Sequence, residues 1–146
     1  MLRVLSLCSV LVLTGCASTG MYDAPSGDGL AALSIDNQLS VPADDAADSG
    51  WQMPTSSEAK ASLFKVDGER ISEQAGAESV ELEAGKHSIE VFADQGGILR
   101  FGKFRYNFVE NGTYELRIKA ADGAEDYTLE LIETSAPDAV LKTKNF

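Results

Sequence analysis

The chain has 146 residues, of which 44% are hydrophobic and 24% are charged, the composition of one globular domain. Its formal net charge at pH 7 is −11, from 23 acidic and 12 basic residues. Nucleic acids and anionic lipid headgroups both carry dense negative charge, which such a surface disfavours, and we expect no nucleic-acid partner.

The first 15 residues have the layout of a secretory signal peptide. A short positive start with Arg3 precedes an apolar run over residues 4–13, which two serines interrupt. A helix of about ten residues is roughly 15 Å long, half the hydrocarbon thickness of a membrane, so this run is too short to span one. We therefore predict that residues 1–15 are an export signal, removed from the mature chain.

The next motif follows at the end of this segment, where the chain has Leu13, Thr14, Gly15 and Cys16. These residues resemble the lipobox of bacterial lipoproteins, which combines Leu, a small or polar residue, Gly or Ala, and Cys. The resemblance implies that lipoprotein signal peptidase recognises Leu13, Gly15 and Cys16. It also implies that the Cys16 thiol receives a diacylglyceryl group and its new amine an acyl chain. Two or more acyl chains anchor a protein stably, whereas one gives marginal binding.

The other cysteine of the chain, Cys8, lies inside the predicted export signal. The mature chain therefore has no partner for a disulfide and no second thiol for a metal site. In the enterobacterial members of the lipoprotein family, Asp directly after the lipidated Cys retains the protein in the inner membrane. Here Ala17 and Ser18 follow Cys16. The resemblance thus implies a lipid-anchored protein of the outer membrane that faces the periplasm.

After the lipobox, the composition shifts to Ala, Ser, Gly, Asp and Pro, which favours flexible chain. We predict the lipidated Cys and a tether over residues 16–57, and a folded domain over residues 58–146. About 40 residues of flexible chain have a root-mean-square reach of roughly 35 Å, enough to hold a domain clear of the headgroups. The apolar residues 30–35 and Trp51 interrupt the tether, and we expect them to add either a strand or a docking contact to the domain.

From Ala61 onward, hydrophobic residues alternate with polar ones, the period of half-buried antiparallel strands. No stretch has a sustained helical period, and the turn signals are too closely spaced for crossover helices. We predict an all-β fold, a small antiparallel β-sandwich with immunoglobulin-like or prealbumin-like topology, or a small barrel. The turn signals are Asp67-Gly68, Ala84-Gly85-Lys86, Gln95-Gly96-Gly97, Asn111-Gly112 and Asp122-Gly123.

Residues 104–108 and 114–118 each have an aromatic or aliphatic side chain at every second position. A three-residue loop over 110–112, with Gly112 as the left-handed residue of a G1 bulge, would join them as a hairpin with matching apolar faces. Phe101 is out of phase with this pattern, which predicts a bulge or bend at Gly102. The predicted pairs are Phe108 with Tyr114, Tyr106 with Leu116, and Phe104 with Ile118.

This register would place five basic side chains on the outer face of one hairpin. Directly opposed like charges destabilise a strand pair. Either neighbouring carboxylates neutralise the patch, or it meets an anionic partner such as a lipid phosphate, a cell-wall carboxylate or an acidic protein. The basic residues are Arg100, Lys103, Arg105, Arg117 and Lys119, and the nearby carboxylates are Glu115, Asp126 and Glu130.

Three segments carry related turn-and-strand motifs: VDG at residues 66–68, GKHSIEV at 85–91 and GTYELRI at 112–118. They resemble the small β-sandwich repeats of the PEGA type and similar domains of bacterial lipoproteins. The resemblance covers roughly residues 60–134 and departs at the Pro-Glu-Gly-Ala signature, where this chain has LEAG at 82–85. It implies a β-sandwich fold and no catalytic residues.

Few residues are candidates for catalysis or metal binding. The sole histidine, His87, lies next to a turn, and we interpret it as a surface or strand-end residue rather than a general base. Zinc would need more His or Cys than the chain contains. The acidic clusters at 44–48 and 122–126 lack the alternating spacing of an EF-hand loop, so we interpret them as solvated loops, with a weak calcium site as the alternative. We predict no catalytic residue, no cofactor and no metal.

These features favour a non-catalytic lipoprotein whose β-domain serves binding or envelope structure. We expect it to contact the membrane through Cys16 and to bind an envelope protein or a cell-wall component. One alternative is an inhibitor of a periplasmic or host hydrolase, which would present the loop at residues 95–98. The other is an enzyme with two carboxylates about 5 to 9.5 Å apart in a pocket, but the sequence singles out no such pair.

Overall fold

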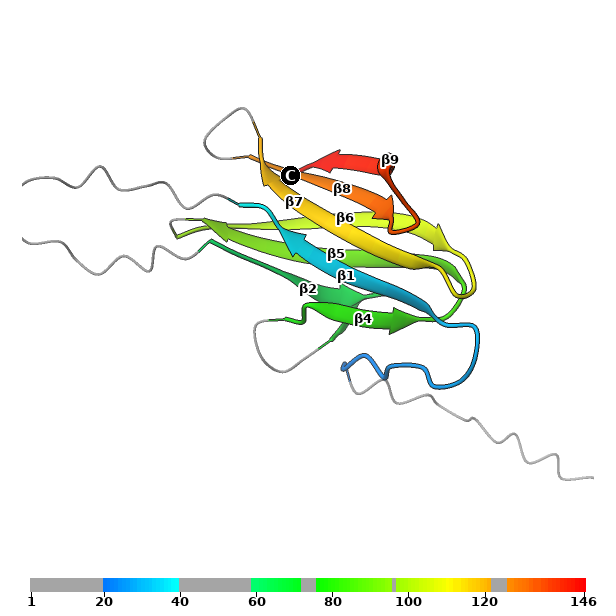
Figure 1. The fold of residues 1–146 in the computed structure, drawn as a ribbon. Helices are drawn as coiled ribbons and strands as arrows, with labels where there is room; N and C mark the ends of the chain where they lie inside the picture. The colour runs from blue at the N-terminus through cyan, green and yellow to red at the C-terminus, as the bar shows by residue number, and fades with distance from the viewer. Residues whose placement is uncertain (1–19, 40–58, 72–75, 96, 122–125) are drawn as a thin grey trace, which may run out of the picture.

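A computed structural model describes residues 20–39, 59–71, 76–95, 97–121 and 126–146 (Figure 1). Two sheets pack face to face, and the predicted all-β sandwich is confirmed. One sheet has five strands in the order β4-β1-β7-β8-β9, and the other has four in the order β3-β2-β5-β6. The predicted export signal with its lipobox, Trp51 and the acidic residues 44–48 lie outside the described residues.

The chain crosses between the two sheets after β1, β3, β4 and β6. Their bounds are β1 (Ala31–Asn37), β2 (Lys60–Val66), β3 (Glu69–Arg70), β4 (Ser79–Leu82), β5 (Gly85–Gln95), β6 (Ile98–Phe108), β7 (Thr113–Ala120), β8 (Tyr127–Glu133) and β9 (Ala136–Asn145).

The core lies between the two sheets and consists of aliphatic and aromatic side chains, two tyrosines among them. Among the described residues, no polar or charged residue is buried as a whole. Each fully buried aliphatic side chain contributes roughly 1.5–3 kcal/mol relative to an exposed one, so the alternating strands supply most of the stabilisation. The five-stranded sheet contributes Leu33, Leu116, Ile118, Leu129 and Leu131, and the four-stranded sheet contributes Leu63, Val66, Ile89, Val91 and Phe108.

Strand β1 lies inside the five-stranded sheet, antiparallel to β4 and parallel to β7. Its residues Ala31 and Leu33 are completely buried. Upstream, Met21 forms a bridge with Arg70, and the Tyr22 amide donates to the Arg70 carbonyl at 2.7 Å. The predicted domain boundary at residue 58 is therefore wrong, because the sandwich already includes the chain from Met21 to β1. Of the two alternatives for residues 30–35, the strand is confirmed.

Strands β6 and β7 do not pair, and the predicted hairpin is wrong. β6 pairs with β5 along its whole length, whereas β7 lies between β1 and β8 in the other sheet (Figure 1). The predicted buried faces are present, but they meet across the interior of the sandwich. The rings of Phe108 and Tyr114 pack edge to face there, with centroids 5.0 Å apart.

The two glycines of this region have other roles than those predicted. In the loop between β6 and β7, the left-handed residue is Asn111, with φ 56°. A Cβ on Gly112 would lie 2.6 Å from the Tyr114 ring. At Gly102 the pairing of β5 with β6 continues without a bulge, and a Cβ would lie 2.8 Å from the Phe146 ring. Both positions need glycine because an aromatic ring packs directly on the backbone.

The edges of β6 and β9 meet along one side of the sandwich. Lys142 Nζ donates to the Arg105 carbonyl at 2.9 Å, and Lys144 Nζ donates to the carbonyl of Lys103. These carbonyls belong to an edge strand and would otherwise be free to pair with another chain. The C-terminal strand therefore protects one edge of the four-stranded sheet.

Candidate functional site

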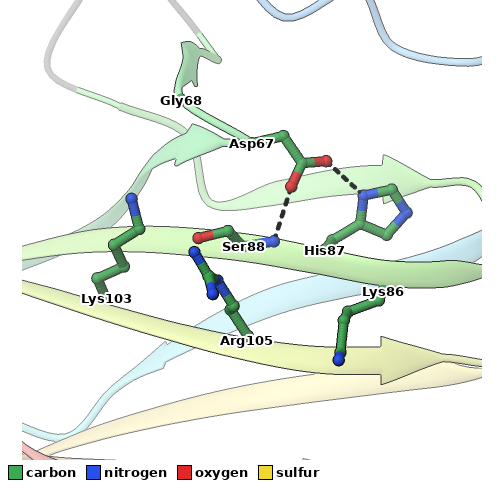
Figure 2. Close-up of a pocket in the computed structure, with 7 residues that line it drawn as sticks. All are labelled: Asp67, Gly68, Lys86, His87, Ser88, Lys103 and Arg105. Atoms are coloured by element: carbon green, nitrogen blue, oxygen red, sulfur yellow. Dashed lines mark hydrogen bonds and ion pairs between the residues drawn. The ribbon is translucent and has the colours of Figure 1, made fainter.

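A hollow of about 310 Å³ lies on the outer face of the four-stranded sheet (Figure 2). It is formed by the turn between β2 and β3, the first residues of β5 and the middle of β6. We call it the cationic pocket. Its lining residues are Asp67, Gly68, Lys86, His87, Ser88, Lys103 and Arg105.

The rim of the pocket is the predicted Asp67-Gly68 turn, which is confirmed. Val66 pairs with Glu69, so Asp67 and Gly68 form the whole loop. Both have positive φ, 51° at Asp67 and 95° at Gly68. Such a two-residue turn matches the twist of the flanking strands. The Asp67 carboxylate then reaches β5, where the Ser88 amide donates to Oδ1 at 2.8 Å. The turn is thereby fixed over the start of β5.

His87 is held by contacts to both of its ring nitrogens. Nδ1 lies 2.7 Å from Oδ2 of Asp67, and Nε2 lies 3.0 Å from the carbonyl oxygen of Glu83. The ring also packs on Phe108, with centroids 6.2 Å apart. Both nitrogens contact groups of the protein itself, so the geometry gives His87 a positioning role for the turn.

The floor of the pocket carries three cations from adjacent strands. Lys103 Nζ donates to Glu90 at 2.7 Å, and Lys65 lies 3.6 Å from the other oxygen of the same carboxylate. The hydrogen bond from Lys103 is the largest cause that lowers the pKa of Glu90 below its ordinary value. Lys86 and Arg105 are exposed, and the described part of the chain offers neither side chain an ion pair. The pocket therefore has a surplus of positive charge.

Ser88 belongs to the lining of the same pocket. Ser88 pairs with Arg105 across the two strands, and Figure 2 shows its hydroxyl on the side of Arg105, away from His87. The oxygen is buried and has no hydrogen-bond partner within the described residues. An unpaired buried hydroxyl costs roughly 1–3 kcal/mol, so a polar group that reached it would be stabilised.

The five basic residues predicted as one patch are divided between the sheets, because the hairpin that would join them does not form. Lys103 and Arg105 line the cationic pocket, and Arg100 lies farther along β6. Arg117 and Lys119 lie on the outer face of the five-stranded sheet. There Arg117 Nε lies 2.9 Å from Glu115 and 3.8 Å from Asp36, and Lys119 donates to Glu130 at 2.6 Å.

A second hollow of about 460 Å³, the N-terminal hollow, adjoins the cationic pocket and shares Asp67 and His87 with it. The Tyr22 hydroxyl donates to the Glu81 carbonyl at 2.8 Å. Burial, followed by the charges of Asp67, Glu83 and Glu69, raises the pKa of Tyr22 to about 12. The remaining lining residues are Asp23, Ala24, Pro25, Ser26 and Glu83.

An aromatic cluster occupies the other end of the same outer face. The rings of Phe64, Phe92 and Phe101 pack together, with the centroids of Phe64 and Phe101 5.4 Å apart. Phe101 remains 57% exposed, and Ile98 and Leu99 nearby in β6 are also exposed. The alternation of β6 continues through Gly102, which places Phe101 outside and explains why it is out of phase with Phe104.

Within the described ranges, no group of His, Cys, Asp and Glu side chains is arranged to hold a metal ion. The described part of the chain also contains no helix that is long and apolar enough to cross a membrane. Of the acidic cluster at 122–126, only Asp126 is among the described residues.

No protein-family model matches the sequence, and no curated protein and no solved structure is significantly similar to the chain.

Proposed function

We propose that the mature chain is a lipoprotein of the bacterial outer membrane, anchored by Cys16 and facing the periplasm. Its β-sandwich would act in binding or envelope structure rather than catalysis. The observation that carries this proposal is the sequence of the first 16 residues, in which a charged start, a short apolar run and the Leu-Thr-Gly-Cys motif follow one another.

The geometry of the site supports binding more than chemistry. The sole histidine has both nitrogens engaged by Asp67 and Glu83, and the mature chain would have no thiol other than the lipidated one. The cationic pocket instead presents Lys86 and Arg105, which pair with no carboxylate of the described residues, on an exposed sheet face. An anionic envelope component is the partner chemistry that fits this surface.

The anchor is tested by replacing Cys16 with Ser in the full chain and feeding cells an alkyne fatty acid. We expect Cys16→Ser to abolish labelling and Cys8→Ser, the matched control inside the export signal, to leave labelling unchanged. Labelling is followed by gel fluorescence, and membrane association by fractionation. Persistent labelling of Cys16→Ser would refute the anchor.

A second candidate function, inhibition of a hydrolase, is favoured by one observation. The start of β6, next to the predicted loop at 95–98, exposes Ile98, Leu99 and Phe101, with 38%, 49% and 57% of their surfaces accessible. An inhibitor needs an apolar element that inserts into an enzyme cleft. Inhibition of periplasmic or host hydrolases that Leu99→Asp abolishes would support this role over envelope binding.

A further inference from the structure

The cationic pocket lies close to the place where the N-terminal segment joins the sandwich. The Arg70 amide donates to the Gly20 carbonyl at 3.0 Å, and the Tyr22 amide donates to the Arg70 carbonyl. The N-terminal hollow that begins at Tyr22 shares two lining residues, Asp67 and His87, with the cationic pocket. The first described residues and the pocket are therefore neighbours on one end of the molecule.

Only a short stretch of chain separates this end from the proposed anchor. Gly20 follows Cys16 by four residues, and four fully extended residues span at most about 14 Å. A lipid on Cys16 would hold Gly20 within that distance of the headgroups. The domain would lie against the leaflet, with the end that carries the pocket nearest to it.

The charge of the pocket fits a headgroup phosphate. In a chain with net charge −11, Lys86 and Arg105 expose two cations that no described carboxylate pairs with. A guanidinium binds phosphate through two parallel hydrogen bonds, and an ammonium adds a point charge. The Ser88 hydroxyl beside Arg105 has no hydrogen-bond partner among the described residues, and it would add a donor once the Arg105 side chain moves toward a ligand.

The acidic residues near the pocket form no described ion pair with Lys86 or Arg105. Asp67 lines the pocket, but its two oxygens are engaged by the Ser88 amide and the His87 ring. Glu83 lines only the N-terminal hollow, and Glu90 is engaged by Lys103 and Lys65. Lys86 and Arg105 thus remain available to an external anion.

We propose that the cationic pocket binds the phosphate of an anionic phospholipid headgroup in the leaflet that holds the lipid anchor. The inference rests on the proposed lipidation of Cys16. Lys86 and Arg105 would contact the phosphate, and the headgroup contact would fix the orientation of the sandwich on the membrane.

The test uses the purified lipidated protein in nanodiscs of phosphatidylcholine, with or without phosphatidylglycerol. An N-hydroxysuccinimide ester acylates exposed lysines, and peptide mass spectrometry gives the rate for each. We expect phosphatidylglycerol to slow acylation of Lys86 about fivefold, the electrostatic gain of one basic residue at an anionic surface. Lys119, on the outer face of the opposite sheet, serves as the internal reference and should keep its rate.

The matched variants are Arg105→Gln and Arg117→Gln, which remove the same charge from opposite faces. Arg105→Gln should abolish most of the slowing at Lys86, whereas Arg117→Gln should leave it intact. Either an equal effect of the two variants or equal slowing of Lys86 and Lys119 would overturn the pocket, because both indicate a general surface potential.

Two further measurements test which source of phosphate binds and whether the anchor is present. Inorganic phosphate added to phosphatidylcholine discs should leave Lys86 reactive; protection as strong as that by phosphatidylglycerol would overturn the headgroup assignment. Intact mass reports whether Cys16 carries lipid. A chain without lipid overturns the anchor and with it this inference, whereas a lipidated chain with unchanged Lys86 reactivity overturns the headgroup site alone.

Discussion

The basic residues on the two outer faces of the sandwich differ in their ion pairing. On the five-stranded sheet, Arg117 and Lys119 each contact a carboxylate within 3 Å. On the four-stranded sheet, Glu90 engages Lys103 and Lys65, while Lys86 and Arg105 have no ion pair among the described residues. The number of basic residues on a face therefore does not tell how many of them lack an ion pair, because that depends on the carboxylates beside each one.

The largest effect is expected at Tyr114, which packs between the two sheets that carry these faces. Tyr114 is 2% exposed, packs on Phe108 across the sandwich, and its hydroxyl accepts from the Val109 amide at 3.2 Å. We expect Tyr114→Ala to lower the free energy of unfolding by about 3–5 kcal/mol, as for other large buried rings. Urea denaturation measures it.

Tyr114→Phe is the control for this prediction, because it keeps the ring and removes the hydroxyl. The loss should then be only about 1 kcal/mol, the net worth of one hydrogen bond. Equal losses for the Ala and Phe variants would show that the hydrogen bond, rather than the packing between the sheets, dominates at this position.

How far the sequence predicts this arrangement depends on what a period of two can report. It identifies which side of each strand is buried, and residues 104–108 and 114–118 have the predicted faces. It does not identify the neighbouring strand, because the same apolar face can match a partner in the same sheet or pack on the opposite sheet. The hairpin prediction failed at this step.

For other physical reasons, β1 was predicted only as one of two alternatives, and β9 was not predicted. β1 lies among Gly, Ser and Asp residues, so composition favours a tether although Leu33 is completely buried. No strand is predicted over β9, because all of its residues are exposed and no alternation marks it. Its lysines stabilise the edge of β6 through backbone carbonyls, which leaves no pattern in the sequence.

The cationic pocket was predicted in part. Lys103 and Arg105 belong to the basic patch inferred from the sequence, whereas Lys86, Ser88 and Asp67 do not. These three come from β5 and the β2–β3 turn, and the pairing of β5 with β6 brings them to the patch. The turn signal at Gln95-Gly96-Gly97 lies between β5 and β6, but this pairing was not predicted because β6 was paired with β7.

A direct comparison of the two faces should give a smaller effect. Lys119→Gln removes an ion pair with Glu130 and should cost about 0.2–1 kcal/mol, the range for exposed pairs. Arg105→Gln removes a cation that repels Lys86 and Lys103, so stability should stay the same or rise slightly. Thermal unfolding of both variants at low and high salt measures the contrast. A greater loss in Arg105→Gln than in Lys119→Gln would show that Arg105 is satisfied in the free protein.

The smallest expected effect concerns Glu90, the carboxylate that contacts Lys103 and Lys65. Its pKa is lowered chiefly by the hydrogen bond from Lys103, so its contribution to stability is present above the pKa of an unfolded glutamate. That contribution is lost as the pH falls through the lower pKa of the folded state. Because the ion pairs lie at the surface, it should be below about 1 kcal/mol. Glu90→Gln should flatten the acid limb of a stability profile measured by urea unfolding. An unchanged acid limb would contradict a net stabilisation of the fold by the contact between Glu90 and Lys103.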